Sequence, residues 1–75
     1  MYAIITKKES SIIDLVWLCD KYELTDGVLI CQYEEDVNEF SEITSETHNV
    51  YEFNGEIPDD YGSVPYNFEN GTFIK

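Results

Sequence analysis

Two short apolar runs in the chain have the length and composition of β-strands. Met1–Thr6 is uncharged and rich in β-branched residues, and Lys7 and Lys8 follow it. Val28–Tyr33 comes directly after the turn signal Thr-Asp-Gly. Short apolar runs bounded by turn or charged residues are typical of buried strands. We therefore expect a strand at each of these two places.

The segment Ser10–Leu24 fits two structures. A capping-box pattern begins at Ser11, and residues at helical spacing share one apolar face; these are Ile12, Leu15, Val16, Cys19 and Tyr22. The β-branched residues of 12–17 would instead form a strand, in a hairpin with Met1–Thr6 that turns at Lys8–Ser10. We favour the helix because residues 18–24 lack the alternation of a strand.

A second helix is predicted over Glu34–Glu46. At about 100° per residue, one side would carry Tyr33, Val37, Phe40 and Ile43, and the other Glu35, Glu39, Glu42 and Glu46. Like charges three and four residues apart cost about 0.2–0.5 kcal/mol per pair in an isolated helix. Docking of the apolar side would therefore have to hold this helix.

The last third of the chain reads as strand and turn. Asn70-Gly71 stands between Phe68 and Phe73, and Asn-Gly between apolar flanks is a strong signal for a two-residue hairpin turn. Asn54-Gly55 is a weaker copy, because Pro58 follows closely. Residues 58–65 are expected to form a surface loop or an irregular edge.

Together these elements predict an α+β fold. We expect one domain over residues 1–75, with a small antiparallel sheet of three to five strands and one or two helices packed on one face. Its interior would hold Leu15, Val16, Leu18, Val28, Ile30, Phe40, Phe68 and Phe73. If 12–22 is a strand instead, the domain becomes mainly β.

The charge distribution is strongly one-sided. The chain has 75 residues and a net charge of −12, and its four lysines are Lys7, Lys8, Lys21 and Lys75. Thirteen carboxylates lie between Tyr22 and Ile74 with no lysine or arginine among them. Such a charge disfavours nucleic acid and anionic membrane as ligands, and it favours a basic protein surface.

The residues suited to catalysis or metal binding are few. His48 is the single histidine, and we expect a solvated or hydrogen-bonded loop residue. Cys19 and Cys31 stand in apolar surroundings, which favours two reduced core cysteines over a disulfide. Their spacing matches no zinc site, and no carboxylate run matches a calcium loop. We therefore expect no enzyme, no metal and no cofactor.

The start of the chain lacks the pattern of a signal peptide, and no apolar run approaches the ~20 residues of a membrane helix. This favours a cytoplasmic protein.

The acidic stripe of the second predicted helix has two interpretations. It is either a solvated face or a surface that imitates a nucleic-acid backbone and binds a basic channel. Helical neighbours lie about 5–6 Å apart along the axis, which is of the order of phosphate spacing. Under the second interpretation the partner-binding residues are Glu35, Asp36, Glu39, Glu42 and Glu46, supported by Asp59 and Asp60.

The chain resembles small accessory proteins of bacteriophages and prophages. The opening Met1–Thr6 and the ending Gly55–Phe73 are similar to those of phage tail-region proteins. The acidity is similar to that of phage-encoded DNA mimics, such as anti-restriction, anti-CRISPR and uracil-DNA glycosylase inhibitor proteins. The resemblance implies a non-enzymatic inhibitor of a host nucleic-acid-binding protein. The alternative is a virion or tail-assembly component, in which exposed sheet edges near the Asn-Gly turns would pair and permit a dimer.

Overall fold

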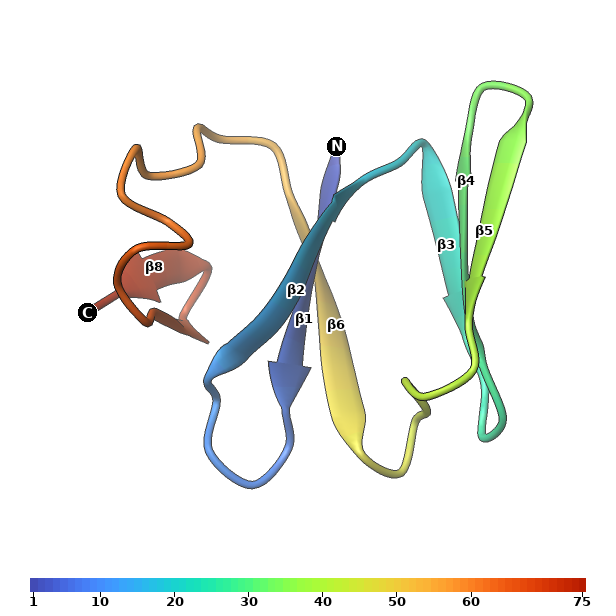
Figure 1. Ribbon diagram of the computed structural model, residues 1–75, viewed down its shortest axis with the longest axis horizontal. Helices are drawn as coiled ribbons and strands as arrows, with labels where there is room; N and C mark the ends of the chain where they lie inside the picture. The colour runs from blue at the N-terminus through green and yellow to red at the C-terminus, as the bar shows by residue number, and fades with distance from the viewer.

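The computed structural model describes residues 1–75 and contains eight strands and no helix. The strands are β1 (Tyr2–Lys7), β2 (Ile13–Leu18), β3 (Lys21–Leu24), β4 (Leu29–Tyr33), β5 (Asp36–Phe40), β6 (His48–Phe53), β7 (Asn67–Glu69) and β8 (Thr72–Ile74). The α+β prediction is therefore wrong, and the fold is all-β (Figure 1).

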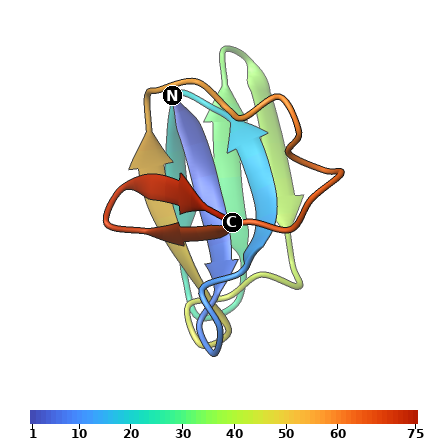
Figure 2. The ribbon, with the colours of Figure 1, turned by 90° about the vertical axis from the view of Figure 1, so that its left-hand side faces the viewer.

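The strands form three antiparallel sheets. Their orders are β2-β1-β6, β3-β4-β5 and β7-β8. The two three-stranded sheets face each other, and the β7-β8 hairpin covers the other side of the β2-β1-β6 sheet (Figures 1 and 2). The middle sheet is thus covered on both faces.

The central strand β1 explains this arrangement. Ala3, Ile4 and Ile5 are all fully buried, although alternate side chains of a strand point to opposite faces. A strand buried on both faces needs a continuous apolar run. Met1–Thr6 supplies one, so the predicted first strand is confirmed.

Two hydrophobic cores result. Ala3 and Ile5 join Leu29, Ile43 and both cysteines between the two three-stranded sheets. On the opposite face Ile4 joins Ile13, Tyr66 and Phe68 under the C-terminal hairpin. Each core depends on residues that alternate along the same strand.

The helix predicted over Ser10–Leu24 is wrong, and the alternative hairpin forms. The segment contains β2 and β3, and Ile4 pairs with Val16 while Ala3 pairs with Trp17. The β-branched residues suit the pleated surface beside β1, and this packing outweighs the capping signal. Of the apolar positions that matched a helical face, Leu15, Cys19 and Tyr22 belong to the first core and Val16 to the second, while Ile12 is 42% exposed.

The helix predicted over Glu34–Glu46 is also wrong. Tyr33 pairs with Asp36 around the two-residue turn Glu34-Glu35, and Glu34 has a φ of 54°. In a helix the glutamates three and four residues apart would have been neighbours on one face, whereas the hairpin separates them. Val37, expected on the buried side, is 58% exposed.

The predictions for β4 and for the C-terminal hairpin are confirmed. Asn70 and Gly71 have φ values of 55° and 79°, as a type I′ turn requires. No hairpin forms at Asn54-Gly55, and most of 58–65 is irregular apart from one bridge between Tyr61 and Val64.

The predicted interior was only partly right. Of its residues, Phe68 is buried and Leu18 is 44% exposed. The others, Leu15, Val16, Val28, Ile30, Phe40 and Phe73, are half-buried.

Candidate functional site

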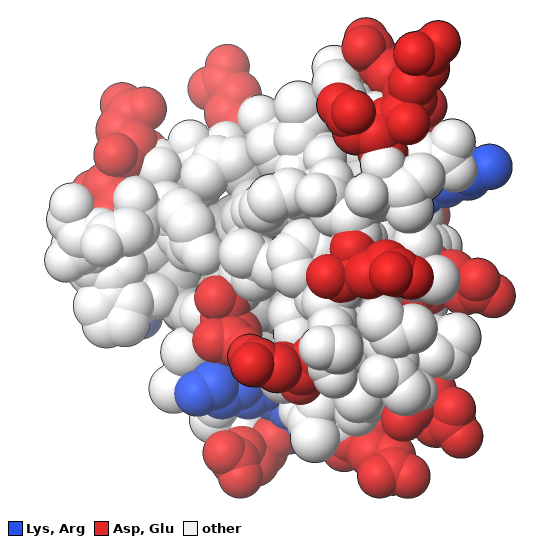
Figure 3. Space-filling model, turned by 45° about the vertical axis from the view of Figure 1, so that its right-hand side comes forward, with Lys and Arg blue, Asp and Glu red and all other residues white.

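The predicted acidic residues do not form one stripe. Glu35 lies in the β4-β5 turn, Asp36 and Glu39 lie on β5, and Glu42 and Glu46 lie in the 41–47 segment that leads to β6. All five are exposed. Figure 3 shows carboxylates in several groups with neutral surface between them. The structure therefore spreads these charges along one edge of the β3-β4-β5 sheet and beyond it.

The pairing of β5 decides which way its side chains point. Asn38 pairs with Cys31 and Phe40 pairs with Leu29, and both partners are buried in the core. Asp36 shares their side of the sheet, while Val37 and Glu39 point to the outer face. Neither β4 nor β5 contains a lysine. The strand thus presents carboxylates on both faces without a neighbouring cation on either strand.

Asp59 and Asp60 lie apart from this group, in the loop before β7. The Tyr66 hydroxyl donates a hydrogen bond to Asp60, and Lys75 Nζ lies 2.6 Å from Asp60 Oδ2. These contacts, the one with Lys75 first, hold the pKa of Asp60 below its usual value. The carboxylate of Asp60 is therefore already paired within the chain, whereas Asp59 is exposed.

Next to β5 lies an apolar groove, which the sequence did not predict. It has a volume of about 370 Å³ and is lined by Trp17, Leu18, Tyr33, Asp36 and Asn38. Leu18 is 44% exposed and Tyr33 is 36% exposed. The groove forms because the end of β2 meets the β4-β5 hairpin, two segments that no local pattern connects.

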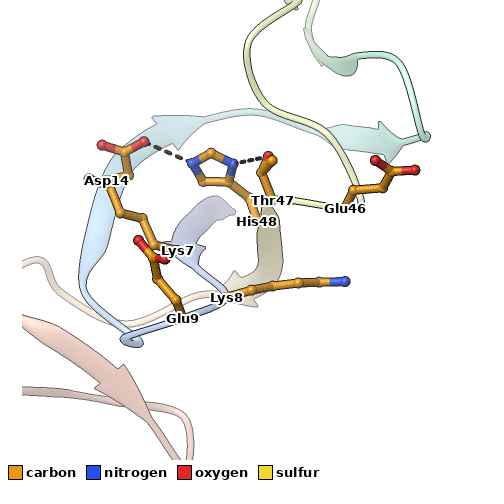
Figure 4. Close-up of a pocket in the computed structure, with 7 residues that line it drawn as sticks. All are labelled: Lys7, Lys8, Glu9, Asp14, Glu46, Thr47 and His48. Atoms are coloured by element: carbon orange, nitrogen blue, oxygen red, sulfur yellow. Dashed lines mark hydrogen bonds and ion pairs between the residues drawn. The ribbon is translucent and has the colours of Figure 1, made fainter.

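The largest pocket lies at the opposite end of the molecule and is wholly polar. It measures about 430 Å³ and is lined by Lys7, Lys8, Glu9, Asp14, Glu46, Thr47 and His48 (Figure 4). Its three carboxylates outnumber its two ammonium groups, so it offers no anion site. No group of three His, Cys, Asp or Glu side chains in the structure could hold a metal ion.

His48 is the centre of this pocket. Its Nε2 lies 2.9 Å from Asp14 Oδ2, and its Nδ1 lies 2.7 Å from Thr47 Oγ1 (Figure 4). The side chain is 10% exposed and both ring nitrogens are hydrogen-bonded, which confirms the hydrogen-bonded alternative. The residue begins β6, so only its expected place in a loop was wrong. When the Nε2 hydrogen is donated to Asp14, Nδ1 accepts from the Thr47 hydroxyl.

A β-bulge places Asp14 within reach of His48. Ile5 pairs with Leu15 and Thr6 pairs with Ile13, so Asp14 is the extra residue on β2. Bulges commonly redirect a side chain, and here the carboxylate spans β1 to meet His48 on β6. The contact joins the two outer strands of the sheet.

The cysteines are confirmed as free and buried. Burial raises the pKa of Cys31 to about 12 and also raises that of Cys19. Because the thiolate is the reactive form, neither thiol is suited to act as a nucleophile near neutral pH.

No protein-family model matches the chain, and neither a curated protein nor a solved structure shows significant similarity to it. The structure contains no helix that could span a membrane.

Proposed function

We propose that the protein is a non-enzymatic binding protein that occupies the basic, nucleic-acid-binding surface of another protein. The observation that carries this proposal is the exposed set Glu35, Asp36, Glu39, Glu42 and Glu46, on and after a β-hairpin that contains no lysine. Like the phage inhibitors that it resembles in acidity, it would act in the cytoplasm of a host cell.

The physical basis is charge complementarity. A nucleic-acid-binding protein attracts phosphates through clustered Lys and Arg, and exposed carboxylates without internal counterions satisfy the same cations. The hairpin geometry replaces the regular helical spacing expected from the sequence. Imitation would therefore lie in the density of negative charge and not in a regular repeat. Association should slow steeply as salt rises, since screening shortens the range of attraction.

The experiment begins with pull-down from a bacterial lysate and mass spectrometry. The affinity of a recovered nucleic-acid-binding protein is then measured for wild type and for the triple variant Glu35→Lys, Glu39→Lys, Glu42→Lys. We expect loss of binding. The matched control is Glu52→Lys, Glu56→Lys, Glu69→Lys, which changes net charge equally at exposed sites elsewhere.

Equal weakening by both triple variants would contradict a defined acidic site, because net charge alone would then explain binding. Recovery of no nucleic-acid-binding protein at low salt would contradict the proposal as a whole. Because the replaced side chains are exposed, both triple variants should stay folded. Thermal melts of both variants check that a loss of binding is not caused by unfolding.

A second candidate, a virion or tail-assembly component, is favoured by one observation. The six-residue strand β6 pairs only with β1, so its other edge is free, and Tyr51 on it is 42% exposed. Free edges pair with other strands. Size-exclusion chromatography with light scattering tests this candidate: a monomer at all concentrations, with no incorporation into particles, would contradict it.

A further inference from the structure

Strand β5 has a free edge next to the apolar groove. It pairs with β4 along its whole length, from Asp36 to Phe40, and with no other strand. Sheet edges in proteins are commonly protected by charged side chains, lysine above all, by proline or by a bulge. β5 contains no lysine or proline, and its pairing with β4 runs without a shift in register. Its two charged residues, Asp36 and Glu39, are both acidic, so they oppose the addition of an acidic strand and leave the edge open to a basic one.

The register indicates which backbone groups are free. In a hairpin with a two-residue turn the closing pair, Tyr33 and Asp36, is hydrogen-bonded. Alternation along an antiparallel ladder then directs the backbone of Asn38 and Phe40 to β4. The N–H and C=O groups of Val37 and Glu39 are left to face outward, and neither residue takes part in a backbone hydrogen bond outside the sheet.

Apolar side chains flank this edge on both faces of the sheet. On the inner side lies the groove of Trp17, Leu18 and Tyr33. On the outer side Val37 is 58% exposed. A strand added to β5 would alternate its side chains between these two surfaces. It would gain contact area on each face as well as hydrogen bonds.

The carboxylates around β5 determine which kind of segment can pair with its free edge. Asp36 lies in the groove, Glu39 lies on the outer face, and Glu35 and Glu42 lie beyond the two ends of the strand. A second copy of the chain also carries a net charge of −12 and would bring its own Asp36 and Glu39 to this edge with no cation on either β5 strand, which is unfavourable. An extended segment with lysine or arginine on alternate residues would instead place these cations beside Glu39 on the outer face, while its remaining residues face the groove.

We propose that the free edge of β5 is a docking site for an extended, basic polypeptide segment, which adds as a fourth strand to the β3-β4-β5 sheet and seats apolar side chains in the groove of Trp17, Leu18 and Tyr33. The proposal rests on the proposed function and specifies its partner: a flexible basic segment that adopts a strand on binding, as in other cases of strand addition.

The test uses a synthetic seven-residue peptide that alternates valine and lysine, titrated into the ¹⁵N-labelled protein. We expect shifts at Val37, Glu39 and the Trp17 indole, and slower solvent exchange of the Val37 and Glu39 amides. A peptide of the same sequence, N-methylated on the residues that face the protein edge, keeps the charge and lacks the donors. It should bind at least about tenfold more weakly.

Two variants, the second with a matched control, complete the test. Val37→Pro removes an outward-facing N–H, which an edge strand tolerates, and should weaken the valine-lysine peptide roughly 2- to 10-fold. Leu18→Ser removes an apolar wall of the groove and should also weaken it, whereas Ile74→Ser, at a similarly exposed position on β8, should not.

Equal binding of the methylated and unmethylated peptides would overturn strand addition while leaving acidic binding of a basic protein intact. Shifts confined to residues away from β5 and the groove would overturn the site itself. Tight binding of a valine-glutamate peptide would overturn the charge argument, and with it the proposed function.

Discussion

Replacing Phe68 by alanine should destabilise the whole protein and not only the C-terminal hairpin. Phe68 is 4% exposed, and its ring centroid lies 5.5 Å from those of Tyr51 and Phe73 and 5.8 Å from that of Phe53. Removing a buried phenylalanine side chain costs about 3–5 kcal/mol. A chain of this length has about 4–11 kcal/mol in total, so the variant would lose about a quarter or more of its stability.

The coupling runs through β1. Ile4 packs in the same core as Phe68, while its neighbours Ala3 and Ile5 pack in the core that contains Trp17 at its margin. Trp17 fluorescence therefore reports on the core that Phe68 does not touch. With a urea m-value of about 1 kcal/mol/M, the midpoint followed by Trp17 should fall by about 3 M or more.

The assay is urea unfolding followed by Trp17 fluorescence and by far-ultraviolet circular dichroism. The control is Ile74→Ala, which removes a 38% exposed side chain from the same hairpin and should have a small effect. A Trp17 midpoint that stays at the wild-type value in Phe68→Ala would refute the reasoning, because the two cores would then unfold independently.

Three further outcomes are expected. Contacts with Lys75 and Tyr66 lower the pKa of Asp60, so the stabilisation that Asp60 provides is present above the ordinary carboxyl range and is lost as pH falls. Wild type should therefore lose more stability below about pH 4 than Asp60→Asn, and equal losses in urea titrations would contradict this. Burial raises the pKa of Cys31 to about 12, so the stabilisation that the buried thiol provides is present below the ordinary thiol pKa of about 8.5 and is lost as pH rises toward 12. The melting temperature of Cys31→Ala should therefore fall less than that of wild type as pH is raised over this range. With a net charge of −12, the wild type should melt at a higher temperature in moderate salt than in low salt; an unchanged or lower melting temperature would show that carboxylate repulsion does not limit stability.

Sequence patterns predicted the parts of the fold that depend on local chemistry. The apolar runs of β1 and β4 and the Asn70-Gly71 turn each have one dominant local solution. The same patterns failed over β2 and β5, because residues at helical spacing also alternate well enough to form strands. The hairpin of β4 and β5 was not predicted, because glutamate seldom adopts the positive φ that Glu34 has in its turn, 54°.

For the candidate site, the exposure of the residues was predicted but their arrangement in space was not. The acidic positions on β5 and in the 41–47 segment are exposed, but their arrangement follows from a hairpin that the sequence did not indicate. The groove depends on the approach of β2 to the β4-β5 hairpin, a tertiary contact. The bond between Asp14 and His48 depends on a bulge and on strands far apart in sequence.

The contrast between β1 and β5 has a consequence for how this protein can evolve. Every residue from Ala3 to Thr6 is buried, so substitutions there act on one core or the other. From Asp36 to Glu39 no side chain is buried, and only Phe40 joins the margin of a core. Mutations can therefore accumulate along β5 with little selection against misfolding. A lineage that carries this fold could change the proposed binding specificity of that edge while its interior stays conserved.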